Sequence, residues 1–104
     1  MKESDWKLFK KIKTQALDLY CKNALNDFKQ IIDETEKTHH ERYGEIYELV
    51  HKRDKTLAAL FDGHSRSKAD LQLMLMRREK IVNQTLISQM SEEFQDQTNP
   101  FKFN

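Results

Sequence analysis

Only three of the 104 residues are Gly or Pro, whereas average usage would supply roughly a dozen. Because these two residue types supply most sharp turns, the chain can make few turns and must fold into few, long elements. This scarcity disfavours a β-sandwich, a Rossmann-type domain and a collagen-like or glycine-rich linker protein. A chain of this length suits one domain, since it can bury about two thirds of its unfolded surface without disulfides or metal. We therefore expect an all-α protein.

The first half of the sequence predicts a long antiparallel helical hairpin over residues 5–62. Its first helix carries apolar residues at the three-and-four spacing of one helical face. These residues occupy positions 6, 9, 16, 17, 20, 24, 28 and 31. Ser4 or Asp5 is the expected N-cap, because short polar side chains can accept from the free N–H groups of the first turn.

A turn near residues 34–38 is expected to divide the hairpin. The apolar signal lapses there, and Thr38 with Glu41 has the form of a capping box that begins a second helix. The competing interpretation is one uninterrupted helix over residues 5–62, because no Gly or Pro precedes Gly44. Such a helix would need a partner chain to cover its apolar stripe.

The second helix is expected to run to about Asp62 and to bury one face. Its expected inward residues share helical spacing and are Tyr43, Ile46, Tyr47, Val50, Leu57, Leu60 and Phe61. Gly44 lies inside this helix, where Gly costs about 1 kcal/mol relative to Ala. Its presence suggests close helix packing or a bend. Gly63 is well placed to end the helix.

A third helix is expected near residues 66–82, with Ser65 or Ser67 as its N-cap. Within residues 69–76, ADLQLMLM, apolar side chains point almost all round a helix. A helix without a polar face must be surrounded, so the sequence predicts that this third helix is buried.

A short fourth helix is expected after Asn83. It would carry three apolar residues, Leu86, Ile87 and Met90. Residues 91–98 continue it with polar side chains, and Pro100 stops it. The four helices predict a helical bundle in a single domain over residues 1–98, followed by a C-terminal tail over residues 99–104.

Charge is balanced overall but unevenly spread. The net charge is +1, so no basic excess favours a nucleic-acid partner. Residues 1–13 carry five Lys against two acidic residues, and residues 14–50 carry eight acidic against four basic residues. Residues 51–80 carry eight basic and four acidic residues. Such blocks can pair within the fold or between subunits.

The cysteine content and the apolar runs predict a cytoplasmic protein. The single Cys cannot form an intramolecular disulfide, which is typical of a reducing compartment. The longest apolar runs are a few residues, such as LMLM at 73–76, so we expect no membrane span and no membrane partner. The N-terminal segment lacks the continuous apolar region of a secretory signal.

Two Glu-x-x-His motifs are of the kind that di-iron helix bundles use. They are Glu36 with His39 and Glu48 with His51. A metal site would need each motif on a different helix, with further Glu ligands. On one continuous helix the two motifs lie about 18 Å apart, at 1.5 Å per residue. They could meet only across a hairpin tip near Gly44, which the capping signal at Thr38 disfavours. A solvated face with charge pairs is therefore favoured, the metal site is the weaker alternative, and we expect no cofactor.

Residues 57–69 have the outline of a helix-turn-helix, with Gly63 in the turn. Arg66 and Lys68 would lie at the start of the second helix, where they could reach bases or phosphates. A DNA-recognition helix needs a polar face exposed to solvent, however, and the apolar residues of 69–76 leave almost no such face. An ordinary interhelical corner is favoured over a DNA-binding regulator.

Catalysis is not expected. Cys21 and a His could form a nucleophile and base if the fold joined them, but Cys21 flanks the apolar stripe, where a buried structural Cys is commoner. The sequence contains no glycine-rich phosphate loop and no nucleophile elbow.

Apolar residues outnumber the places in which one small chain can bury them. The surplus comprises a second stripe on the first helix, the apolar block of the third helix and two aromatic residues of the tail. Its members are Leu8, Ile12, Leu19, Leu71, Leu73, Met74, Met76, Phe101 and Phe103. Self-association would cover them, because homodimers commonly have core-like interfaces. We expect a non-catalytic protein-interaction module that acts as a homodimer or binds another protein; the alternative is a monomer whose fourth helix and tail cover the first helix.

Overall fold

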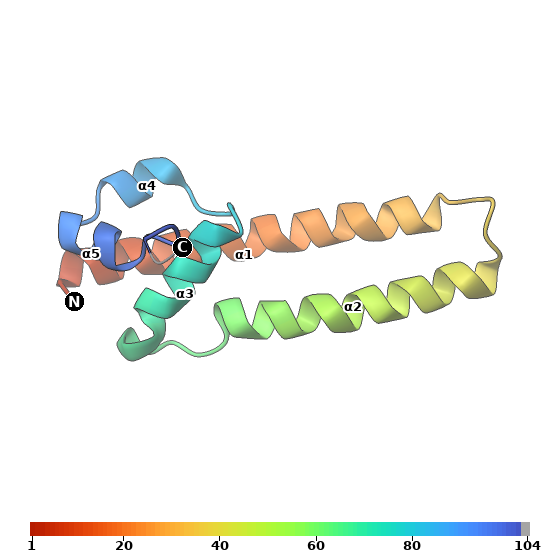
Figure 1. The fold of residues 1–104 in the computed structure, drawn as a ribbon, viewed down its shortest axis with the longest axis horizontal. Helices are drawn as coiled ribbons and strands as arrows, with labels where there is room; N and C mark the ends of the chain where they lie inside the picture. The colour runs from red at the N-terminus through yellow and green to blue at the C-terminus, as the bar shows by residue number, and fades with distance from the viewer. Residues whose placement is uncertain (103–104) are drawn as a thin grey trace.

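A computed structural model describes residues 1–102, which form helices joined by short loops and contain no strand. The helices are α1 (Glu3–Ile32), α2 (His39–Phe61), α3 (Arg66–Arg78), α4 (Gln84–Ser88) and α5 (Glu92–Gln97). Figure 1 shows α1 and α2 as a long antiparallel hairpin, with α3, α4 and α5 gathered around one end of it. The predicted all-α helical bundle is confirmed.

The turn of the hairpin lies where the capping signal places it. Thr38 is the N-cap of α2, and its side chain accepts from the backbone N–H of Glu41 at 3.1 Å. The guanidinium of Arg42 donates to the carbonyl of Ile32 and so satisfies an open acceptor at the end of α1. The interpretation of one uninterrupted helix is therefore wrong.

Gly44 does not mark a close helix contact. A Cβ built at this position would meet nothing within 4 Å. Gly63, by contrast, has φ +80°, which L-residues rarely adopt, and it follows the end of α2 as predicted.

The hydrophobic core lies at one end of the molecule, where α3, α4 and α5 pack on the first half of α1 and the last turns of α2 (Figure 1). We call this end, with those five segments, the head. Its largest fully buried apolar side chains come from three helices and are Phe9, Ile12, Leu60, Leu73 and Met76. The rest of the hairpin, residues 17–57, projects from the head as a two-helix arm, and the molecule measures 52 × 27 × 23 Å.

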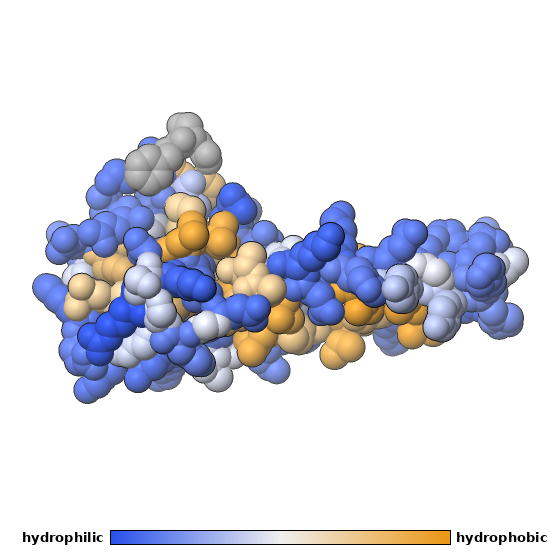
Figure 2. Space-filling model, turned by 90° about the horizontal axis from the view of Figure 1, so that it is seen from below, coloured by the Kyte–Doolittle hydropathy of each residue, from blue (hydrophilic) through white to orange (hydrophobic). Residues whose placement is uncertain are grey.

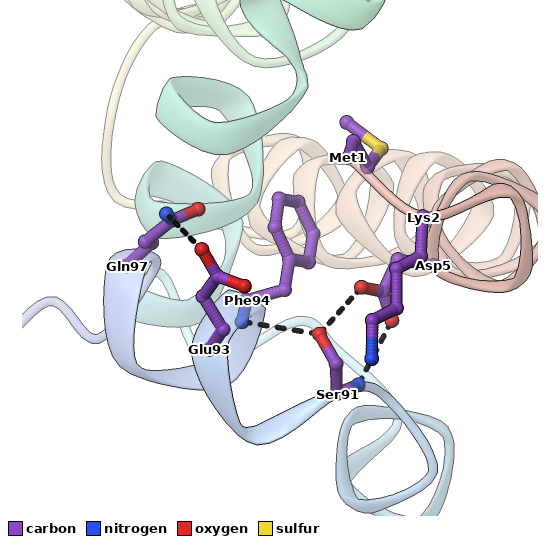
Figure 3. Close-up of a pocket in the computed structure, with 7 residues that line it drawn as sticks. All are labelled: Met1, Lys2, Asp5, Ser91, Glu93, Phe94 and Gln97. Atoms are coloured by element: carbon purple, nitrogen blue, oxygen red, sulfur yellow. Dashed lines mark hydrogen bonds between the residues drawn. The ribbon is translucent and has the colours of Figure 1, made fainter.

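Asp5 anchors α5 to α1 instead of capping its own helix. The N-cap of α1 is Lys2, whose side chain makes no capping hydrogen bond, so the prediction of Ser4 or Asp5 as N-cap is wrong. Asp5 is 2% exposed and accepts from the backbone N–H of Ser91 at 2.9 Å and from its hydroxyl at 2.6 Å (Figure 3). The same hydroxyl accepts from the N–H of Phe94 and caps α5.

The third helix is only partly buried. Ala69, Leu73 and Met76 lie in the core, but Leu71 is 55% exposed, so the prediction of a fully surrounded helix is wrong. The α1 and α2 faces cover one side of α3, and α5 packs on another part of it.

The expected fourth helix is two short helices. Asn83 caps α4, accepting from the N–H groups of Thr85 and Leu86. The chain leaves the helix at Gln89, and Ser91 begins α5 in the segment predicted to continue α4. The break allows Leu86, Ile87 and Phe94 all to enter the core.

The Asp5 contacts generate a stability prediction. Asp5→Ala removes both acceptors of Ser91 and should lower the free energy of unfolding by about 2 kcal/mol, because hydrogen bonds to a charged group are the stronger ones. Urea denaturation followed by helical circular dichroism measures the loss. Ser4→Ala, at the exposed neighbouring position, serves as the control, and an equal effect of both variants would refute the anchoring role.

Candidate functional site

The two Glu-x-x-His motifs do not converge. Glu36 lies in the turn, whereas His39, Glu48 and His51 lie along α2. His39 contacts the guanidinium of Arg42 at 2.8 Å, and the ring of His51 lies over Tyr47 with 4.2 Å between centroids. Among residues 1–102 no three His, Cys, Asp or Glu side chains are grouped so that they could hold a metal ion. The structure therefore does not assemble the alternative metal site.

The cations of the possible helix-turn-helix lie at the corner between α2 and α3. Arg66 pairs with Glu3 at 2.7 Å and lies over the Trp6 ring at 5.2 Å. The guanidinium thus ties α3 to the start of α1. Lys68 is exposed, and its side chain lies beside Gly63.

The predicted interface residues do not form one surface. Ile12, Leu73 and Met76 are fully buried in the core of the single chain, so a partner cannot reach them. Leu8 and Met74 are half-buried, and Leu8 packs against the core. The prediction that one chain cannot cover these residues is wrong for Ile12, Leu73 and Met76, because the packed helices of the head bury them.

The remaining predicted interface residues are exposed but scattered. Leu19 lies on α1, Leu71 on α3 and Phe101 follows α5. Phe103 lies outside the described residues.

A largely apolar surface lies instead on one side of the arm. Burial along α1 fades toward the tip of the hairpin, from fully buried Ala16 to half-buried Phe28. Burial also decreases toward the tip along α2, where Tyr43 and Tyr47 are exposed and Ile46 and Val50 are half-buried. The prediction that Tyr43 and Tyr47 face inward is therefore wrong, and Ile46 and Val50 are buried only in part.

This surface, which we call the arm face, consists of residues at helical spacing on the two arm helices. On α1 they are Leu17, Cys21, Leu25, Phe28 and Ile32. On α2 they are Tyr43, Ile46, Tyr47, Val50 and Leu57. Leu25 is 63% and Tyr47 59% exposed. Figure 2 shows apolar side chains along one edge of the arm, next to the broader head.

A groove runs between α1 and α2 on the arm face. Cys21, Leu25 and Phe28 form one wall of it. On the other wall, Val50 and Leu57 lie beside the charged residues Arg53 and Asp54. The prediction that Cys21 is buried is only partly met, since its thiol is half-buried in this groove.

The opposite side of the arm is polar. Asp27 lies there and forms an ion pair with Arg53, which also lines the groove of the arm face. Lys52 and Thr56 lie beside Glu79 at the end of α3. Two packed helices touch along one line, so each leaves two flanks uncovered. On this arm, one flank is polar, and the other, the arm face, is mainly apolar but includes Asp54 and His51.

A second hollow, at the start of α1, is lined by Lys2, Asp5, Ser91, Glu93 and Gln97 (Figure 3). Figure 3 shows Asp5 directed at Ser91, so its carboxylate is committed to the α1–α5 contact.

Comparison with models of protein families, with curated protein sequences and with solved structures finds no match to this chain. Among the described helices, none combines the length and the apolar character needed to cross a membrane.

Lys13 is a buried cation in the head. Its ammonium donates to the carbonyl of Gly63 at 2.5 Å and to Gln72 Oε1 at 3.5 Å, while Gln72 donates to the carbonyl of Asp62. Burial lowers the pKa of Lys13 below its usual 10.5, and the charge of Asp62 opposes this shift. The folded protein therefore holds this proton less tightly than the unfolded chain.

The Lys13 pKa generates a pH prediction. Below the lowered pKa, Lys13 is charged in both the folded and the unfolded protein, so the full cost of burying the charge lowers the free energy of unfolding. As pH rises from that value toward 10.5, the folded state loses the proton first and the cost is relieved. The unfolding free energy of the wild type should thus rise relative to that of Lys13→Met, measured by denaturation at pH 8 and in the alkaline range below 10.5. A constant or falling difference would contradict the assignment.

Proposed function

We propose that this chain is a non-catalytic protein-interaction module that acts as a homodimer through the arm face. The observation that carries the proposal is the largely apolar surface on a two-helix arm that no other described element covers. Contiguous exposed apolar surface of this kind is typical of protein-binding sites, whereas single exposed apolar residues are ordinary.

The composition of the arm face supports a protein partner. Tyr43 and Tyr47 place two exposed phenol rings on the surface, and Tyr is enriched among residues that dominate binding energy. Leu25 and Ile32 add exposed aliphatic side chains. Association would remove these side chains from water, and this burial favours the free energy of association by about 25 cal/mol per Å² of apolar surface buried.

A second copy fits the shape of the arm. The two helices of the arm form a single layer. A second layer is needed to cover the apolar side of that layer and complete a helical core. A second arm supplies that layer and produces a four-helix bundle, in which each helix has two neighbours. A two-fold interface uses the same patch on both subunits, so the arm face needs no other surface to complete it.

The proposal predicts a mass of twice 12.5 kDa in light scattering coupled to size-exclusion chromatography. The double variant Leu25→Asp with Tyr47→Asp should raise the dimer dissociation constant at least about tenfold, because it places charge in a dry interface. Both side chains are largely exposed in the single chain, so the helical content should stay unchanged.

Leu71→Asp is the matched control, because Leu71 is exposed on α3 away from the arm. This variant should have the same mass in solution as the wild type. A wild-type monomer at high concentration would exclude the homodimer, and a dimer broken by Leu71→Asp alone would place the interface on the head.

A further inference from the structure

We propose that Asp54 limits the affinity of the arm face for a second copy, so that two chains pair reversibly. This inference rests on the proposed function and adds the residue that sets the strength of the pairing. It holds for either way in which two arms can lie against each other, because it depends on the place of Asp54 on its own helix.

Asp54 belongs to a stripe of residues along α2 that are alternately four and three positions apart. The stripe consists of Tyr43, Tyr47, Val50, Asp54, Leu57 and Phe61. This spacing is the heptad pattern by which a helix packs one seam against another helix. Asp54 is the one charged residue of the stripe, and every other member is aliphatic or aromatic.

The carboxylate of Asp54 is exposed and has no partner within the described chain. Asp54 lines the groove of the arm face beside Val50 and Leu57. No hydrogen bond or ion pair joins its side chain to another of residues 1–102, whereas the adjacent Arg53 is paired with Asp27. In the single chain, water alone solvates this charge.

A second copy on the arm face would remove that water. Tyr43 and Tyr47 of the stripe are 73% and 59% exposed, so the stripe faces the side that the second copy would cover. Asp54 lies between Tyr47 and Leu57 along the stripe, inside the surface that would be covered. Enclosing a carboxylate that has no partner costs free energy, and this cost opposes association.

The residues that would face Asp54 carry no cation in either two-fold arrangement. If each helix faces its own copy, Asp54 meets the stripe of the partner subunit, which offers apolar side chains and a second carboxylate. If α2 faces α1 of the partner subunit, Asp54 meets the arm-face residues of that helix. These are Leu17, Cys21, Leu25, Phe28 and Ile32. Lys22 is exposed and lies about 100° round the helix from Cys21, at the edge of this face.

A polar residue at one heptad position is a known way to weaken and restrict the pairing of helices. The arm face thus combines apolar surface that favours association with one carboxylate that opposes it. A dimer with this balance separates on dilution, which a stripe of apolar residues alone would resist.

Two substitutions at Asp54 test the proposal. Asp54→Leu continues the apolar stripe and should lower the dimer dissociation constant at least about tenfold. Asp54→Asn removes the charge but keeps a polar side chain of similar shape, so it should lower the constant by a smaller factor. Sedimentation equilibrium over a range of protein concentrations measures the constants.

Lys52→Leu is the matched control. It introduces the same side chain at an exposed position of α2, beside Thr56 and Glu79 on the polar side of the arm, and should leave the constant unchanged. Asp54 is exposed and unpaired among the described residues, so circular dichroism should show the same helical content in the wild type and both Asp54 variants.

The outcomes separate this inference from the proposed function. A wild-type dimer that tightens with Asp54→Asn and further with Asp54→Leu supports both. A dimer that Asp54→Leu leaves unchanged or weakens, or that Lys52→Leu tightens equally, overturns the role of Asp54 and leaves the homodimer standing. A wild-type monomer that Asp54→Leu converts to a dimer supports the role of Asp54 and overturns the homodimer. Monomers of both proteins at every concentration overturn both.

Discussion

The structure depends on the limited surface that two packed helices can cover. Each helix of the hairpin buries the strip that faces the other, and Ala24 and Tyr20 lie on that strip. Apolar side chains beside the strip stay in water unless another layer covers them. In the head, α3, α4 and α5 supply this layer, and Phe9 and Ile12 become fully buried. The arm has no such layer, and the same helices expose apolar side chains there.

Polar side chains hold the covering layer in place. Asp5 fixes the start of α5, and Lys13 with Gln72 fixes the loop between α2 and α3. Both Asp5 and Lys13 occur in the first helix among apolar neighbours, where a buried charge is costly without partners. Their partners lie in distant parts of the sequence, so the head closes only when α1, α3 and α5 meet. This makes the head one cooperative unit.

Local signals in the sequence predicted the helices well and their surroundings poorly. Thr38 and Glu41 located the turn, and Gly63 and Asn83 located a helix end and a helix start, because each acts on its own backbone neighbours. The same reasoning assigned Ile12, Leu73 and Met76 to an interface and Tyr43 and Tyr47 to the interior. Helical spacing tells which residues share a face, but not whether another helix covers that face.

The sequence by itself determined an all-α chain with a long hairpin, because Gly and Pro are scarce and apolar residues follow helical spacing. It also contained enough apolar residues to leave some exposed. Only the tertiary structure decided which ones, placing the uncovered surface on the arm between Leu17 and Leu57. The reason is that burial depends on where the later helices dock, and they dock at one end of the hairpin, through contacts between residues far apart in the chain.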